Sequence, residues 1–157
     1  MIADKIYIIK HSFIVKLLSH TFNFFEYFCA PLLLLFIRLW MARIFWHSGL
    51  GKISSWPETL ALFQNQYNVP FLPSELVAYL TTMTELSCPI LLLFGFATRL
   101  AAIPMLLMTA VIQLTYMSGG ENLYWAVLLM TLICFGPGAI SLDWVVKKMI
   151  NWRGNRF

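Results

Sequence analysis

The stretch that decides the fold runs from Leu32 to Ile53 and reads LLLLFIRLWMARIFWHSGLGKI. A helix needs about 20 mostly apolar residues to cross the hydrocarbon core of a bilayer, and this stretch has that length. Three further apolar runs follow at residues 76–94, 100–117 and 123–142. Backbone N–H and C=O groups in lipid must be satisfied within their own segment, so each run is expected to be a helix. The sequence therefore predicts an all-α integral membrane protein, built as a four-helix bundle.

The composition excludes an ordinary water-soluble domain. Of the 157 residues, 60% are hydrophobic and 11% are charged, whereas soluble domains are about 25% charged. The mean hydropathy is +0.75. The three cysteines are isolated in apolar surroundings, which argues against a C-x-x-C redox pair, and the histidines are too scattered for a metal site. We therefore expect no metal.

The basic residues predict how the chain is oriented. They gather on one side of the four runs, at Lys5, Lys10, Lys16, Arg99, Lys147, Lys148, Arg153 and Arg156, whereas the opposite side carries Lys52. The positive-inside rule then places both termini in the cytoplasm. Bases that flank apolar runs serve orientation, so nucleic acid is not an expected partner. The expected partners are the lipid bilayer and either another protein or a second copy of the chain.

Three segments are expected along the chain. Residues 1–30 have the pattern of a basic amphipathic helix that lies on the cytoplasmic membrane surface. Residues 31–145 are the bundle, and residues 146–157 are a basic cytoplasmic tail.

Two connections carry further signals. Residues 54–75 contain a short apolar helix that Pro70 and Pro73 stop. That helix is either a lid over the outer end of the bundle or a simple interfacial anchor. Later in the chain, Gly136-Pro137-Gly138 is expected to end or kink the last span, and Ser141 or Asp143 to cap a short helix after it.

Ionisable residues within the runs are candidate functional groups, because charges at membrane depth are costly unless they are paired. At 1.5 Å per residue, Arg43 lies about 18 Å from the cytoplasmic end and Glu85 about 15 Å from the outer end. These matching depths predict an Arg43–Glu85 pair, with Arg38 as a competing partner. The pair either fixes helix register, as buried ion pairs can do, or couples proton and electron movement.

A second set of side chains is typical of a quinone or other ligand site. A quinone headgroup needs hydrogen bonds to two carbonyl oxygens, aromatic walls and access from lipid. The candidate contacts towards the outer side are His47, Lys52, Gln113, Tyr116, Glu121 and Tyr124. The alternative is that they belong to the aromatic belt and to bundle packing. Quinone is thus the cofactor considered, and no catalytic residue is assigned.

An ordered series of motifs resembles the DoxX family. The first span contributes Arg38-Leu39, Ile44-Phe45, Ser48-Gly49 and Lys52. The hairpin of the second and third spans contributes Glu85-Leu86, Leu91-Leu92-Leu93-Phe94-Gly95 and Thr98-Arg99-Leu100-Ala101. The last span contributes Glu121-Asn122-Leu123-Tyr124-Trp125-Ala126, Gly136-Pro137-Gly138 and Ser141-Leu142-Asp143. Two departures are Ala42, where relatives commonly carry glycine, and Arg43, which the family does not generally require.

The resemblance implies a four-helix inner-membrane protein. Members include the DoxD subunit of thiosulfate:quinone oxidoreductase and components associated with thiol and oxidative-stress defence. The positions that the family motifs single out are Arg38, Lys52, Glu85, Arg99 and Asp143. Two hypotheses follow: a redox-associated subunit that interacts with quinone and a partner protein, or a non-catalytic anchor or assembly and maturation factor. If the protein is an enzyme, it is at most a subunit of a quinone-linked oxidoreductase.

Overall fold

The computed structural model describes residues 15–65, 72–116 and 120–154. Within these ranges helices are the only regular secondary structure, which confirms the predicted all-α fold. In chain order the elements are the π-helical turn η1 (Phe25–Cys29), α2 (Ala30–Ser54), α3 (Trp56–Asn65), α4 (Ser74–Phe94), α5 (Thr98–Tyr116), α6 (Glu121–Phe135) and α7 (Leu142–Gly154).

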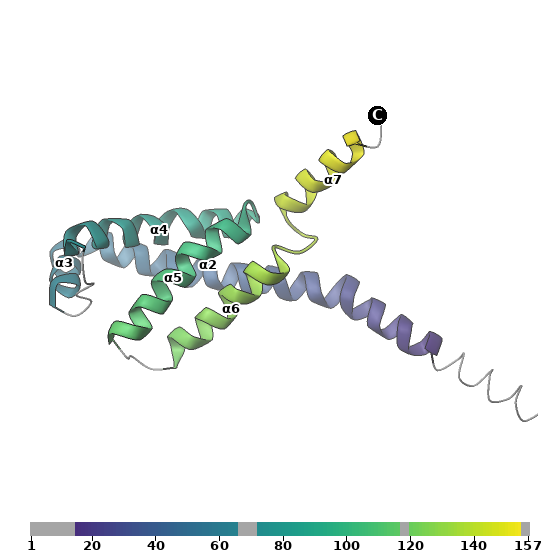
Figure 1. Ribbon diagram of the computed structural model, residues 1–157, viewed down its shortest axis with the longest axis horizontal. Helices are drawn as coiled ribbons and strands as arrows, with labels where there is room; N and C mark the ends of the chain where they lie inside the picture. The colour runs from purple at the N-terminus through teal and green to yellow at the C-terminus, as the bar shows by residue number, and fades with distance from the viewer. Residues whose placement is uncertain (1–14, 66–71, 117–119, 155–157) are drawn as a thin grey trace, which may run out of the picture.

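The bundle consists of α2, α4, α5 and α6 (Figure 1). Within the bundle, α2 packs on α4 and α6, and α5 also packs on α4 and α6. A short turn joins α4 to α5, and the helices alternate in direction along the chain (Figure 1). The bundle therefore has two distinct ends. We call the end with the α4–α5 turn the Arg38 end, because Arg38 lies against Gly95 there, and the end near α3 the Lys52 end.

The first helix is longer than one membrane span. Residues Val15–Ser54 form one continuous helix of 40 residues, with η1 inside it. At 1.5 Å per residue this helix is roughly 60 Å long, about twice the thickness of the hydrocarbon core. Its N-terminal part extends beyond the Arg38 end, away from the other bundle helices (Figure 1). The described part of the predicted amphipathic segment 1–30 therefore continues the first span, and residues 1–14 lie outside the described residues.

The core lies where the four helices meet, and it combines small side chains with aliphatic and sulfur-containing ones. Small residues allow helices to approach closely, which matters in lipid because packing replaces the hydrophobic effect as the force between helices. The buried apolar cluster consists of Ile37, Met41, Ala42, Phe45, Cys88, Leu92, Ala101, Ala102, Met105, Leu129 and Leu132.

The last span is shorter than the predicted run 123–142. The Gly-Pro-Gly sequence ends α6 at Phe135, and Ser141 Oγ accepts a hydrogen bond from Trp144 N at 3.2 Å, so Ser141 caps α7. Both the helix end and the cap match the expectation. Helix α6 has 15 residues and rises about 22 Å, and a non-helical segment joins it to α7.

Two helices are long and apolar enough to cross a bilayer on length and hydropathy, Val15–Ser54 and Ser74–Phe94. Two shorter apolar helices accompany them, at Thr98–Leu114 and Glu121–Phe135. The four helices predicted as spans therefore all exist, and α6, with 15 residues, is the shortest of them.

Candidate functional site

A buried ion pair joins α2 to α4 towards the Lys52 end. Lys52 Nζ lies 2.7 Å from both Glu85 Oε1 and Glu85 Oε2, and 2.9 Å from Ser48 Oγ. Ser48 Oγ in turn donates to Glu85 Oε1 at 3.1 Å. An ammonium group has three N–H donors, and these three oxygens can satisfy all of them. The result is a closed network of one lysine, one serine and one carboxylate.

Helix geometry brings this network together. Ser48 and Lys52 are four residues apart, so they lie on the same face of α2. Gly49 lies between them and allows α4 to come close, since a Cβ atom at Gly49 would lie 2.9 Å from Leu86 Cδ2 and 3.1 Å from Glu85 Cβ. A larger residue at position 49 would push α4 away and lengthen the contact with Glu85.

The two charged groups differ in accessibility. The Lys52 side chain is 17% exposed and the Glu85 side chain 3% exposed. Lys52 is therefore the more accessible member of the pair.

A cavity of about 860 Å³ adjoins the ion pair. Its wall is largely apolar and comes from all four bundle helices, with Phe63 of α3 added at the Lys52 end. The polar groups in this wall are Ser48, Lys52, Thr81, Glu85, Thr109, Glu121 and Asn122. An apolar cavity with a few polar groups is the usual form of a small-molecule site.

Helix α3 packs on α2 and α4 at the Lys52 end of the bundle. The Thr59 hydroxyl donates to the Lys52 carbonyl oxygen at 3.1 Å, and the ring of Trp56 lies 4.5 Å from the ring of Tyr79 on α4. Phe63 is buried and lines the cavity. The two expectations for residues 54–75, a lid or an interfacial anchor, both stay predictions.

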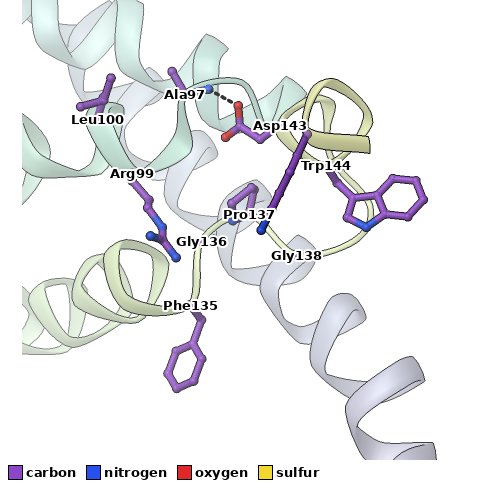
Figure 2. Close-up of a pocket in the computed structure, with 10 residues that line it drawn as sticks. Ala97, Arg99, Leu100, Phe135, Gly136, Pro137, Gly138, Asp143 and Trp144 are labelled. Carbon is purple, nitrogen blue, oxygen red and sulfur yellow. Dashed lines mark hydrogen bonds between the residues drawn. The ribbon is translucent and has the colours of Figure 1, made fainter. Parts of the chain in front are cut away.

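At the Arg38 end the charged groups bind the backbone. Arg38 is 2% exposed, and its Nη1 donates to the carbonyl oxygens of Pro137 and Ile140, at 2.8 Å each. Asp143 accepts hydrogen bonds from Ala97 N at 2.8 Å and Thr98 N at 3.1 Å (Figure 2). The carbonyl groups of a non-helical segment that is covered by other chain need such partners, because a buried carbonyl without a hydrogen bond is costly. Arg38 thus supplies hydrogen bonds to two carbonyl groups of the segment that follows the short helix α6.

The predicted Arg43–Glu85 pair is not formed, because Glu85 pairs with Lys52 instead. Arg43 is exposed, and it lines a shallow groove of about 300 Å³ between α2 and α4 together with His47. The reason is the rotation of α2 about its axis. Two residues along a helix are about 200° apart, so Arg43 faces away from the side on which Phe45 is buried.

The six candidate ligand contacts do not gather in one place. Lys52 and Glu121 line the cavity, whereas His47 lies in the groove between α2 and α4. Tyr124 is exposed on α6. Gln113 on α5 is half-buried, and within the described residues its Oε1 accepts no hydrogen bond. The side chain of Tyr116 lies outside the described residues.

Sequence reasoning missed Ser48 and the cavity residues Thr81 and Asn122. A signal for Ser48 was present, since Ser48 and Lys52 are spaced by one helical turn on the side of α2 that carries Phe45 and Gly49. Asn122 stands in the family motif that begins at Glu121 but was not assigned to the site, and Thr81 carried no signal, because a threonine in an apolar span is common. The remaining family-motif position, Arg99, donates from Nη2 to the Cys134 carbonyl oxygen at 3.2 Å.

Comparison with known proteins places these residues in a family. A family model described as DoxX matches residues 33–118, more than half of the chain. That range includes Arg38, Lys52 and Glu85. An uncharacterized protein of Haemophilus influenzae is 31% identical over 128 residues, which cover 74% of this chain and 84% of that protein. No solved structure matches the chain.

Proposed function

Because this chain belongs to the DoxX family and is a membrane protein of that type, we propose that it is a redox-associated subunit that binds quinone at the Lys52 end and acts with a partner protein. The observation that carries the proposal is the cavity of about 860 Å³ with the Lys52–Glu85 pair in its wall. The proposal also places both termini on the cytoplasmic side of the inner membrane.

The cavity has properties that a quinone headgroup requires. Its volume falls within the range of about 300–1,000 Å³ that ligand pockets occupy. Aromatic side chains contribute to its wall at Phe45, Phe63 and Trp125. Two exposed residues, Leu80 of α4 and Leu107 of α5, also line it. A lipophilic molecule could therefore enter from the bilayer between α4 and α5.

The ion pair has a chemical role in this proposal. Lys52 is the accessible member, and a ligand oxygen could replace Ser48 Oγ as its third acceptor while both bonds to Glu85 persist. Glu85 keeps the ammonium group charged and in place. A bound quinone would supply two-electron, two-proton chemistry, and the pair would hold a proton beside the ligand oxygen. The electrons would come from a redox centre on the partner protein.

A cavity-filling variant tests the proposal without breaking the ion pair. Val77 lines the cavity, whereas the adjacent Leu76 is exposed and does not. Val77→Phe places a ring in the space that the headgroup needs, so quinone affinity should fall roughly tenfold, which is 1.4 kcal/mol. Leu76→Phe is the matched control and should retain as much quinone as the wild type. The measurement is quinone content per protein after gentle detergent extraction of the full chain.

Two results would contradict quinone binding. One is wild-type protein that retains no quinone and takes up none when it is added. The other is equal retention by Val77→Phe and Leu76→Phe with both variants folded, since ligand would then bind outside the cavity.

The second candidate, a non-catalytic anchor or assembly factor, is favoured by one observation. Three protein oxygens satisfy the three N–H donors of Lys52, as expected of a pair that fixes helix register. In that case a soluble partner would lose its membrane attachment when this chain is removed. Quinone content would be the same in every cavity variant.

A further inference from the structure

A second hollow lies at the Arg38 end, outside the quinone cavity. It has a volume of about 430 Å³ and is formed by the start of α5, the loop between α6 and α7, and the first turns of α7. Figure 2 shows Arg99 extending from α5 towards the Gly136 loop, with Asp143 turned towards Ala97. The hollow is thus enclosed by three separate segments of the chain.

The unneutralised charge in this hollow is positive. Arg99 and Lys147 both line it, and both are exposed. Asp143 also lines it and keeps its negative charge, so two cations stand against one carboxylate, whose oxygens accept hydrogen bonds from Ala97 N and Thr98 N. A guanidinium group has five N–H donors, and the contact of Arg99 Nη2 with the Cys134 carbonyl oxygen uses one of them. Donors and charge therefore remain for an anion.

The surroundings of these two cations are apolar. Leu100 is 71% exposed and Phe135 is 74% exposed, and both line the hollow. The indole of Trp144 lies at its other side and points outward (Figure 2). A free inorganic anion makes no favourable contact with exposed leucine and phenylalanine side chains. A phospholipid does, because its phosphate is joined through glycerol to acyl chains that pack against such side chains.

The position along the helices agrees with a lipid ligand. The apolar helix α5 begins at Thr98 and α6 ends at Phe135, so the hollow lies at the ends of two apolar helices, beside the lysine-containing helix α7. Phospholipid phosphates lie at the corresponding boundary of a bilayer. Basic pockets of this kind between membrane helices bind anionic headgroups.

We propose that the hollow between α5, the α6–α7 loop and α7 binds the phosphate of an anionic phospholipid. Arg99 and Lys147 bind the phosphate oxygens, and the acyl chains run along Leu100 and Phe135. The lipid would hold α7 against the bundle, because Lys147 belongs to α7 and Arg99 to α5. This site is independent of the quinone proposal, since the two cavities share no lining residue.

The test is native mass spectrometry of the full chain in mild detergent, titrated with phosphatidylglycerol, phosphatidylcholine or inorganic phosphate. Arg99→Gln/Lys147→Gln should weaken phosphatidylglycerol binding roughly thirtyfold, because each basic side chain near anionic lipid contributes about 1 kcal/mol. The matched control is Arg43→Gln/Lys16→Gln, which removes the same charge. Arg43 lies in the groove between α2 and α4, Lys16 lies in the N-terminal part of the Val15–Ser54 helix, and neither lines the hollow, so this control should bind phosphatidylglycerol as the wild type does.

Each outcome of this experiment is decisive. Selective loss in Arg99→Gln/Lys147→Gln, with wild-type preference for phosphatidylglycerol over phosphatidylcholine, supports the site. Equal loss in both double variants would show a general charge effect and overturn it, as would the absence of a preference between the two lipids. Displacement of phosphatidylglycerol by millimolar inorganic phosphate would assign the hollow to a free anion and overturn the lipid. If the double variant does not fold, Lys147→Gln alone should weaken binding roughly fivefold.

Discussion

The two ends of the bundle stabilise buried charge in different ways. At the Arg38 end, Arg38 and Asp143 bind backbone carbonyl and N–H groups of segments far away in the sequence. At the Lys52 end, Lys52 and Glu85 bind each other and Ser48, next to a large cavity. Charged groups that bind the backbone fix the positions of the α4–α5 turn and the segment between α6 and α7. A side-chain network can exchange one partner for a ligand oxygen while the helices stay in place.

The largest effect is expected from Gly95→Val at the Arg38 end. Gly95 has a φ of +65°, and a Cβ atom there would lie 2.6 Å from Arg38 Nη1 and 2.7 Å from Ser141 Cβ. Left-handed strain and overpacking together should lower the free energy of unfolding by about 4 kcal/mol. Gly51→Val is the control, since nothing lies within 4 Å of its Cβ position. Unfolding in detergent measures both, and equal effects would show that the Arg38 end is not tightly packed.

A smaller but still large effect is expected at the Lys52 end. Glu85→Leu leaves Lys52 without its carboxylate, and breaking a buried pair from one side costs about 3 kcal/mol. The double variant Lys52→Met/Glu85→Leu removes both charges and should recover most of that loss. Unfolding of the single and double variants in the same detergent measures the coupling. Additive losses would mean that the two side chains do not act as a pair.

The smallest effect is expected from Arg43→Gln. Arg43 is exposed in the groove between α2 and α4, and substitution of an exposed side chain usually changes stability by less than about 0.5 kcal/mol. The same unfolding assay, with Glu85→Leu as the reference, gives the comparison. If Arg43→Gln lowered the free energy of unfolding as much as Glu85→Leu does, the result would support the Arg43–Glu85 pair that depth alone predicts.

Much of the bundle could be predicted from the sequence. Hydropathy located the helices, and the Gly-Pro-Gly sequence and Ser141 located the end of α6 and the cap of α7. The continuation of α2 to Val15 was not predicted, because Lys16, His20 and Glu26 interrupt the apolar run without interrupting the helix. A helix in residues 1–30 was predicted, but as a separate amphipathic helix and not as part of the first span.

The candidate site was predicted in part. Depth along the helix axis correctly marked Glu85 as a buried carboxylate, and the family motif marked Lys52. The choice of Arg43 as partner was wrong because depth contains no information about rotation around the axis. Counting helical turns from Phe45 and Gly49 would have favoured Lys52, whose long side chain reaches back towards Glu85.

The sequence by itself determined that this chain is a bundle of apolar helices, because hydropathy and turn residues are properties of local segments. Only the tertiary structure decided which charged side chains form a pair and where cavities remain between the helices. Those outcomes depend on how each helix is rotated and how closely its neighbours approach. Side chains such as Gly49 and Gly95 set that approach, and their effect appears only once the helices are packed.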